Sequence, residues 1–177
     1  LPDGVLVAVD EAYREFVTDP DVPDALEVFG DRPNVVVLRT MSKAWGLAGL
    51  RIGWMHAAPE VAATVRKCVT PFSTSNLAQA AAMAALREGA EMRRRVALVV
   101  AERERVLEAM RDIGVDVPDS QSNFLWLPVG DKTAKVASEC EQSGVIVRPF
   151  AKDGIRITVG TPAENDAMLL ALEKALE

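Results

Sequence analysis

The sequence predicts an α/β fold followed by a small α+β unit. Three short runs rich in β-branched residues occur early in the chain, "GVLVAVD" at 4–10, "NVVVLRT" at 34–40 and "LRIGWMHA" at 50–57. Apolar runs with so little alternation are typical of strands covered on both faces, as in a mixed, mostly parallel sheet with helices packed against it. The segment between the first two runs is rich in Asp and Pro, which indicates a functional loop and a short helix.

The middle of the chain predicts two helices. Residues 75–113 are rich in Ala, Leu, Glu and Arg, and Gly89 is expected to separate the helices. The second helix, about 90–112, sets apolar residues against charged ones and could connect two domains. Its apolar residues are Val96, Val99, Val100, Val106, Leu107 and Met110, and its charged residues are Glu102, Arg103, Glu104 and Arg105.

The remainder of the chain predicts the small α+β unit. The runs "NFLWLPV" at 123–129, "GVIVRPF" at 144–150 and "GIRITVG" at 154–160 are expected strands. Helices are expected at "KTAKVASECEQSG" and "TPAENDAMLLALEKALE". Thr161 and Glu164 have the spacing of a capping box for the last helix, with Pro162 at its first position.

Composition excludes several classes of partner. The 177 residues include 20 Lys and Arg and 26 Asp and Glu, so the net charge is −6, with both signs interspersed. This leaves no basic face for nucleic acid or anionic lipid. No apolar run is long enough to span a membrane and no signal-peptide pattern opens the chain, so we expect a soluble, cytoplasmic protein.

The two cysteines and the single histidine predict neither a disulfide framework nor a metal site. Cys68 and Cys140 are far apart in the sequence, and His56 is the one imidazole available as a ligand. We expect both thiols to be buried and free, and we assign no role to His56.

The stretch "RTMSKAWGLAGLRIGW" at 39–54 raises the possibility of a phosphate site. Lys43 follows a predicted strand, with Thr40 and Ser42 before it and Arg51 eight residues after it. Hydroxyls and a guanidinium bind phosphate well. Taken alone, however, such a lysine is more often a solvated surface charge.

The end of the first predicted strand adds a carboxylate and a phenol. In "VAVDEAYREF", Asp10 ends the strand and Tyr13 follows three residues later, so both can face the crevice at the carboxyl ends of the strands. A carboxylate, a phenol, an amine and a phosphate clamp suit pyridoxal phosphate, pairing in turn with its ring nitrogen, ring oxygen, aldehyde carbon and phosphate. The structural alternatives are that Asp10 caps a turn, Tyr13 is a core aromatic and Arg51 is an ion-pair partner.

Three motifs carry a resemblance to a known family. "DEAY", "LRTMSKAWGLAGLRIGW" and "GIRITVGTPAENDAML" occur in the order found in the fold-type I aminotransferases, and the resemblance covers the whole chain. It is closest to the histidinol-phosphate aminotransferase subfamily, and within it to the aromatic amino acid aminotransferases. The resemblance implies that residues 1–90 are the C-terminal part of the large cofactor-binding domain. Residues 91–177 would then be the interdomain helix and the small domain.

The resemblance also implies residue roles. Lys43 would bind pyridoxal phosphate covalently and then move a proton between the substrate Cα and the cofactor. Asp10 would bind the pyridine nitrogen and Tyr13 the ring oxygen, while Thr40, Ser42 and Arg51 would bind the phosphate. Arg156 would bind the substrate α-carboxylate. Its alternative is an arginine that faces solvent.

The function implied is transamination of an aromatic amino acid with a 2-oxo acid acceptor. Histidinol-phosphate transamination is the alternative, because an arginine at the place of Arg148 binds the substrate phosphate in those enzymes. The other reading of Arg148 is a purely structural residue. A non-catalytic regulator that keeps the aminotransferase fold is a third hypothesis. Family members are roughly twice this length and homodimeric, so we expect these residues to be a C-terminal fragment with an incomplete site. Trp45, Trp54, Trp126 and Phe124 are expected to serve packing.

Overall fold

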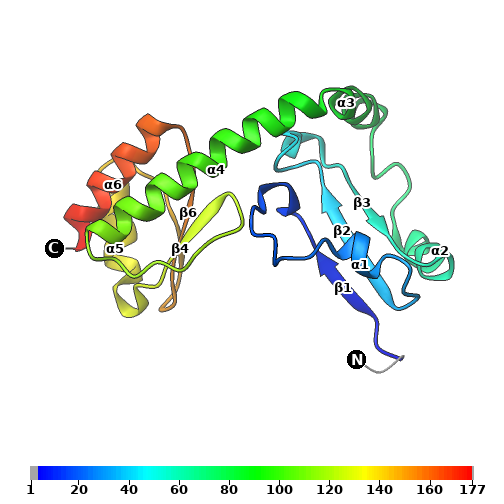
Figure 1. Cartoon of the computed structure of the whole chain (residues 1–177), viewed down its shortest axis with the longest axis horizontal. Coiled ribbons are helices and arrows are strands. Elements are labelled where there is room, and N and C mark those ends of the chain that lie inside the picture. Colours follow the sequence, from blue (N-terminus) through cyan, green and yellow to red (C-terminus); the bar gives the residue numbers. More distant parts are fainter. Residues whose placement is uncertain (1–3, 177) are drawn as a thin grey trace. The chain divides into compact units, whose positions relative to one another are not determined.

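The computed structural model describes residues 4–176, and these form two compact units that divide between Arg95 and Val96. The first unit holds β1 (Val7–Asp10), β2 (Val35–Thr40) and β3 (Gly53–His56), which form one sheet in that order (Figure 1). β1 and β2 are parallel, whereas β3 runs antiparallel to β2. The sheet is therefore mixed, with one pair of each kind.

Helix α1 (Ala25–Phe29) covers one face of this sheet, where Ala25, Val35 and Val37 are buried. The expectation that all three strands are covered on both faces is wrong for the described chain. Only β2 has a run of buried residues, while β1 is alternately half-buried and exposed and β3 is mostly exposed. The reason is that β1 and β3 are the edges of a three-stranded sheet, and α1 is too short to cover them.

β2 and β3 pair unusually closely at Gly53. A Cβ on this residue would lie 2.7 Å from the carbonyl oxygen of Arg39, so only glycine fits against the neighbouring backbone. The short 3-10 turn η1 (Arg14–Phe16) follows β1, and a second one, η2 (Ala48–Leu50), precedes β3.

Three helices complete the middle of the chain: α2 (Pro59–Cys68), α3 (Asn76–Arg87) and α4 (Gly89–Asp112). α3 and α4 match the two expected helices, and Gly89 is the first residue of α4. α2 has no counterpart among the expected elements, although Pro59 at its first position is a helix-start signal. Because α2 has no buried residue, Cys68 is exposed, and the expectation that both thiols are buried is wrong for it. Cys140 is buried.

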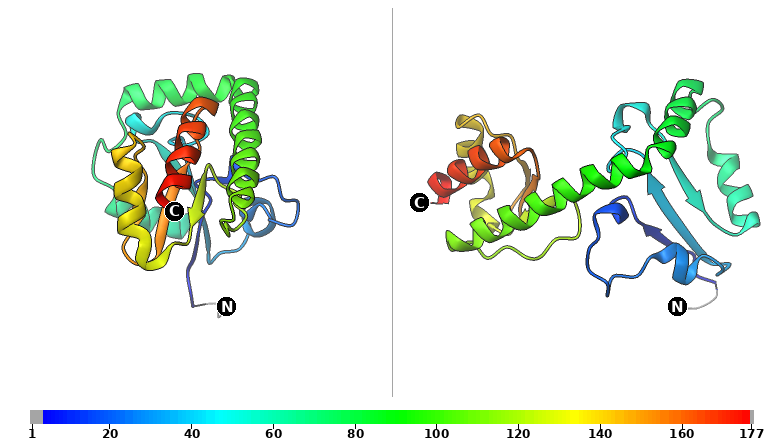
Figure 2. Two further views of the ribbon diagram at one scale, coloured as in Figure 1. Left: turned by 90° about the vertical axis from the view of Figure 1, so that its left-hand side faces the viewer. Right: turned by 45° about the horizontal axis from the view of Figure 1, so that its top comes forward.

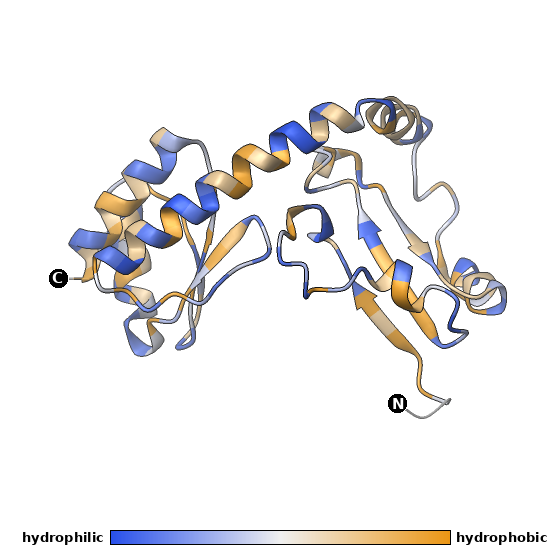
Figure 3. Cartoon of the chain, in the orientation of Figure 1, coloured by the Kyte–Doolittle hydropathy of each residue, from blue (hydrophilic) through white to orange (hydrophobic). Residues whose placement is uncertain are grey.

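The division between the two units falls within α4, and hydrophilic and hydrophobic residues alternate along this helix (Figure 3). The expectation that Arg103 belongs to the charged face is wrong, because its side chain is 0% exposed. Arg103 lies one turn before Leu107 and two turns before Met110, so it is on the buried stripe. Its guanidinium donates to the Ser122 carbonyl at 3.1 Å and to the Glu104 carboxylate at 2.8 Å, which satisfies the buried charge.

The second unit is an antiparallel sheet packed against helices. β4 (Phe124–Leu127), β6 (Gly154–Thr158) and β5 (Arg148–Phe150) lie in that order, with α5 (Thr133–Gln142) and α6 (Pro162–Leu176) completing the unit after the short turn η3 (Gly130–Lys132) (Figure 2). β5 is shorter than the expected strand 144–150. The core combines α4, the odd-numbered residues of β4 and β6, and the last two helices; it includes Val106, Leu107, Met110, Leu125, Leu127, Val136, Cys140, Ile155, Ile157, Met168, Ala171 and Leu172.

The start of α6 confirms the capping box. The Thr161 N–H and hydroxyl each donate to the Glu164 carboxylate at 2.7 Å, and Pro162 is the first residue of the helix. The Glu164 N–H donates to the Thr161 hydroxyl at 3.4 Å. These bonds lower the pKa of Glu164, chiefly through the backbone N–H of Thr161.

Candidate active site

Asp10 and Thr40 lie on the same face of the first sheet. Asp10 is the last residue of β1 and pairs across the parallel ladder with Leu38, so Thr40, two residues further along β2, is on the face of Asp10. The Asp10 carboxylate is exposed and accepts a hydrogen bond from the Ala12 N–H at 3.0 Å. The turn-capping contact is therefore present, and within residues 4–176 no ion pair occupies this carboxylate.

Lys43 is held on a tight loop directly after β2. The Leu47 N–H donates to the Met41 carbonyl at 2.9 Å, the Gly46 N–H donates to the Lys43 carbonyl at 3.0 Å, and Met41 is buried. Gly46 has a φ of +70°, the left-handed conformation that glycine adopts without strain. The loop backbone is thus fixed from inside while Lys43 is exposed.

Lys43 and Tyr13 are brought together although they are thirty positions apart in the sequence. The Lys43 Nζ lies 5.3 Å from the centroid of the Tyr13 ring, a cation–π contact. Within the described residues no carboxylate forms an ion pair with Lys43. An exposed amine held over a phenol ring and not neutralised by a carboxylate is available to react with an electrophilic carbon.

Thr40, Ser42 and Arg51 form a second cluster, around the loop that carries Lys43. The Ser42 N–H donates to the Thr40 hydroxyl at 3.1 Å, and the Arg51 guanidinium donates to the Ser42 hydroxyl at 3.4 Å. It also donates to the Ala48 carbonyl at 2.7 Å. Arg51 has a φ of 52°, an uncommon backbone conformation for arginine, and strain of this kind tends to cluster at functional sites. Two hydroxyls beside one guanidinium suit a phosphate group.

Arg148 and Arg156 form a third group, which belongs to the second unit. They are Cα partners across β5 and β6, and Arg156 is also the Cα partner of Trp126. The Arg156 guanidinium lies 5.2 Å from the Phe124 ring centroid, and its Nε is buried without a hydrogen-bond partner among the described residues. Such a buried donor marks a place where an anion can be received.

Aromatic rings surround these two arginines on the even-numbered face of the second sheet. The Arg148 guanidinium lies 5.3 Å from the Phe150 ring centroid. Trp126 and Phe150 meet edge to face, with centroids 5.5 Å apart and planes at 65°. Trp126 and Phe124 are half-buried beside the guanidiniums, so packing alone does not describe their surroundings.

The other residues that the sequence analysis singled out have structural contacts. The Trp45 indole donates to the Glu15 carboxylate at 3.2 Å, and Trp54 lies under the Arg39 guanidinium at 5.4 Å. His56 contacts the Gly30 carbonyl at 2.9 Å through Nε2. None of these contacts points to a role in chemistry.

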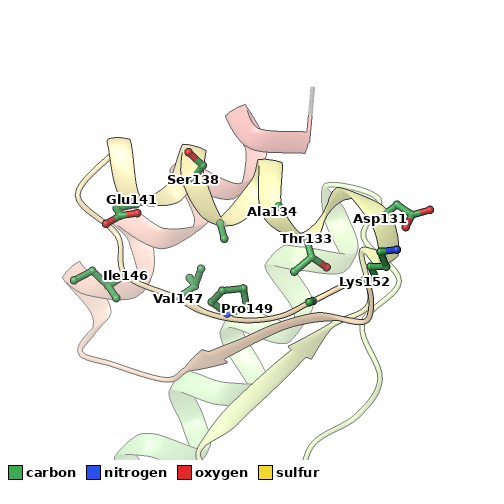
Figure 4. A pocket seen from close by; sticks show the side chains of 11 residues that line it. Asp131, Thr133, Ala134, Ser138, Glu141, Ile146, Val147, Pro149 and Lys152 are labelled. Atoms are coloured by element: carbon green, nitrogen blue, oxygen red, sulfur yellow. The ribbon is translucent and has the colours of Figure 1, made fainter.

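A pocket of about 770 Å³ lies elsewhere in the second unit, between α5 and residues 146–152 (Figure 4). Val147 and Pro149 line it, so it opens on the side of this segment opposite to Arg148. None of the predicted site residues lines it. Among residues 4–176 no cluster of three or more potential metal ligands was found, and no helix there is long and apolar enough to cross a membrane.

The sequence analysis missed a network of four charged residues behind the first sheet. Glu11, Arg14, Asp24 and Arg39, here called the back-face network, are linked by ion pairs of 2.6 to 3.2 Å. Burial favours a higher pKa for Asp24, but the hydrogen bonds and charge of Arg39, with further bonds from Leu26 and Arg14, outweigh it and leave the pKa lowered. The available signal was the position of Glu11 and Arg39, each adjacent in sequence to a predicted site residue.

Comparison with known proteins assigns the family. The family model for aminotransferase class I and II matches residues 2–172. The chain is 52% identical over 174 residues to an aromatic amino acid aminotransferase of Streptomyces avermitilis, covering 98% of this chain and 48% of that protein. It is also 52% identical over 169 residues to one of Thermobifida fusca, covering 96% and 47%. The chain therefore belongs to the aminotransferase class I and II family, and it spans about half the length of these curated relatives.

Solved structures agree on the fold. A histidinol-phosphate aminotransferase from Sinorhizobium meliloti, in complex with pyridoxal-5'-phosphate, matches with a TM-score of 0.89 and 30% identity, covering 99% of this chain and 50% of that one. An aspartate aminotransferase from Thermotoga maritima matches with a TM-score of 0.86 at 21% identity, covering 98% and 48%, and that likeness shows the fold alone. The α/β fold expected from the sequence is confirmed at this level.

Proposed function

We propose that the protein is a pyridoxal-phosphate-dependent aminotransferase that acts on aromatic amino acids with a 2-oxo acid as acceptor. The cofactor is supported by the family and by the Sinorhizobium relative, which is described in complex with it. The substrate class is supported by the two aromatic amino acid aminotransferases that are 52% identical to this chain over the aligned residues. The observation that carries the proposal is the exposed Lys43 amine held over the Tyr13 ring.

The residues of the first unit fit this cofactor. Thr40, Ser42 and Arg51 offer two hydroxyls and a guanidinium, which are donors suited to its phosphate. Asp10 offers an exposed carboxylate on the same face as Thr40, suited to a protonated ring nitrogen. Lys43 offers an amine with no carboxylate ion pair among the described residues, suited to the aldehyde carbon.

When bound, pyridoxal phosphate supplies a ring that accepts the electron pair left on the substrate Cα after its proton departs. The chain's own groups manage the protons. Asp10 holds a proton on the ring nitrogen, and the Tyr13 hydroxyl donates a hydrogen bond to the ring oxygen. The Lys43 Nζ would act as general base toward the proton on Cα and then as the general acid that returns it. Thr40, Ser42 and Arg51 hold the phosphate and so fix the distance over which the proton moves.

Arg156 binds the substrate α-carboxylate in this proposal. Its buried Nε without a partner would gain the acceptor it lacks, and a guanidinium can bind both carboxylate oxygens at once. The rings of Phe124, Trp126 and Phe150 lie on the same face of the sheet and favour an aromatic side chain in the substrate. Residues 1–95 would belong to a large cofactor-binding domain and residues 96–177 to a small domain. We also propose that the protein is cytoplasmic and acts as a homodimer.

Histidinol-phosphate transamination is the second candidate, because Arg148 pairs with Arg156 across the sheet and could bind a substrate phosphate. Steady-state assays separate the two. The protein expressed from its complete gene should transfer the amino group of phenylalanine or tyrosine to 2-oxoglutarate. Its kcat/KM for histidinol phosphate should be at least a hundredfold lower.

Arg148→Gln provides the control. In the aromatic aminotransferase it should change kcat/KM for phenylalanine less than threefold, whereas in a histidinol-phosphate enzyme it should lower kcat/KM for histidinol phosphate about a hundredfold, as expected for one charge-assisted pair. Activity with histidinol phosphate alone would favour the second candidate. No transfer from either donor, with cofactor bound, would favour a non-catalytic member of the family.

A further inference from the structure

The back-face network (Glu11, Arg14, Asp24 and Arg39) lies on the opposite side of the first sheet from the proposed cofactor site. Side chains alternate along a strand, so Glu11 and Arg39 point away from the face that presents Asp10 and Thr40. The ladder continues past β1, because the Glu11 N–H donates to the Leu38 carbonyl at 2.9 Å. Glu11 and Arg39 are therefore the sequence neighbours of Asp10 and Thr40, which lie on the face of the proposed cofactor site.

The contacts among Glu11, Asp24 and Arg39 differ from those of an exposed surface ion pair, because each of these charged groups has more than one partner and is shielded from water. One oxygen of Glu11 accepts from the Arg39 Nε at 3.0 Å and from its Nη2 at 2.8 Å, while the other accepts from the Ala25 N–H at 2.8 Å. The Arg39 Nη2 also donates to Asp24 at 2.6 Å. The side chains of Arg39, Glu11 and Asp24 are only 17%, 8% and 13% exposed, so water screens them weakly.

These bonds tie together the two segments that carry the proposed site. Residues 11–24 form the connection that contains Tyr13, and Glu11 and Asp24 at its two ends are both bound to Arg39. Arg39 in turn belongs to β2, whose end leads directly into the Lys43 loop. The contact between Lys43 and Tyr13 thus spans two segments that the Arg39 guanidinium joins, together with the Trp45–Glu15 hydrogen bond.

We propose that Glu11 and Arg39 are positioning residues, whose ion pair behind the sheet holds Tyr13 and Asp10 in register with Lys43 and Thr40 in front of it. This role for the ion pair rests on the proposed function, but its effect on the Lys43–Tyr13 contact can be tested without any cofactor. A purely structural ion pair would contribute stability and leave the Lys43–Tyr13 contact unchanged. A positioning pair changes that contact while the fold persists.

The first test uses the single tyrosine of these 177 residues. In the protein expressed from its complete gene and labelled with ¹³C-tyrosine, the signal that Tyr13→Phe removes is assigned to Tyr13. Lys43→Met then gives the change in this signal that loss of the amine produces. Glu11→Gln keeps the size of the side chain but removes its charge. Arg39→Lys keeps the charge but loses the planar guanidinium that binds Glu11 through two nitrogens. Both variants should move the signal toward that of Lys43→Met, well below the unfolding temperature.

Asn34→Ala is the matched control. Asn34 donates to the Val5 carbonyl at 3.1 Å, so it joins the beginnings of the same two strands, at the end remote from Lys43. This variant should lower stability without moving the Tyr13 signal. If both network variants fold and leave the signal where the control leaves it, the positioning role is wrong. If Glu11→Gln does not fold, Arg39→Lys decides.

The second test measures cofactor capture in the protein expressed from its complete gene. Titration with pyridoxal phosphate, followed by its absorbance, should give an apparent Kd at least tenfold higher for Glu11→Gln and Arg39→Lys than for the parent or for Asn34→Ala. Equal Kd values would contradict the positioning role. If the parent itself captures no cofactor, the proposed function fails, and the Tyr13 signal still decides the positioning role.

Discussion

Asn165 offers the sharpest test of how the second unit is held together. This side chain, 2% exposed, accepts from the Gly160 N–H at 2.9 Å and donates to the Gly160 carbonyl at 3.1 Å. It also donates to the Glu102 carboxylate at 3.1 Å. One amide thereby joins the end of β6, which carries Arg156, to the start of α6 and to α4.

Asn165→Ala removes all three hydrogen bonds and leaves their partners in a poorly solvated place. A buried polar group that loses its partner costs about 1 to 3 kcal/mol, and because Gly160 is half-buried the lower end of that range applies to its N–H and its carbonyl. Glu102 keeps its hydrogen bond to Arg105, so the two losses at Gly160 predict a decrease of about 2 kcal/mol in the free energy of unfolding. For a chain of this size, that corresponds to a fall of roughly 4 to 8 °C in Tm.

Urea denaturation followed by far-UV circular dichroism measures this effect. The control is the neighbouring Asp166→Ala, which removes an ion pair with Arg105 between side chains that are 44% and 60% exposed. Such exposed pairs contribute less than about 1 kcal/mol. If Asn165→Ala costs no more than the control, the reasoning about these buried hydrogen bonds is wrong.

Three further predictions concern pH, thiol chemistry and packing. Hydrogen bonds from Arg94 and Arg95 lower the pKa of Glu91 from 4.5 to about 2. The stability that Glu91 contributes is therefore complete above pH 4.5 and is lost as the pH falls through about 2. A ¹³C-carboxyl NMR titration measures this pKa, and a midpoint near 4.5 would contradict the prediction. Iodoacetamide should modify the exposed Cys68 and spare Cys140, whose pKa is raised by burial and by a neighbouring glutamate; mass spectrometry of the native protein should find the label on Cys68, and labelling of Cys140 first would contradict the packing. Gly154→Ala should destabilise the chain by about 1 to 3 kcal/mol, because its Cβ would overlap the backbone carbonyl oxygen of Leu127 and lie 2.7 Å from the Trp126 ring; an unchanged urea midpoint would contradict this close packing.

Local signals in the sequence predicted those features that depend on neighbouring residues. The capping box of Thr161 and Glu164 is one, because its hydrogen bonds close within a single helical turn. The apolar stripe of α4 is another, since Val106, Leu107 and Met110 are buried as the helical period requires.

Features that depend on distant partners could not be predicted in this way. The residues next to Arg103 in the sequence do not predict its hydrogen bond to the Ser122 carbonyl, which makes its burial possible. The exposure of Cys68 depends on what covers α2, which its own residues do not state. The back-face network joins residues as far apart as Glu11 and Arg39, so it becomes visible only once β1 and β2 are side by side.

The site itself was partly accessible from sequence. The rule that functional side chains gather at the carboxyl ends of parallel strands predicted that Asp10, Tyr13 and Lys43 would face one region, and the structure places the Lys43 amine over the Tyr13 ring. The roles assigned to these residues, and to Arg148 and Arg156, stay predictions.

The central claim is that the Lys43 amine bonds covalently to the aldehyde carbon of pyridoxal phosphate. Borohydride reduction of the protein with its cofactor, followed by peptide mass spectrometry, tests it directly. The account predicts a pyridoxyl phosphate group on the peptide that contains Lys43, and none in Lys43→Ala. The same group on another lysine, in a protein that transfers amino groups, would contradict it.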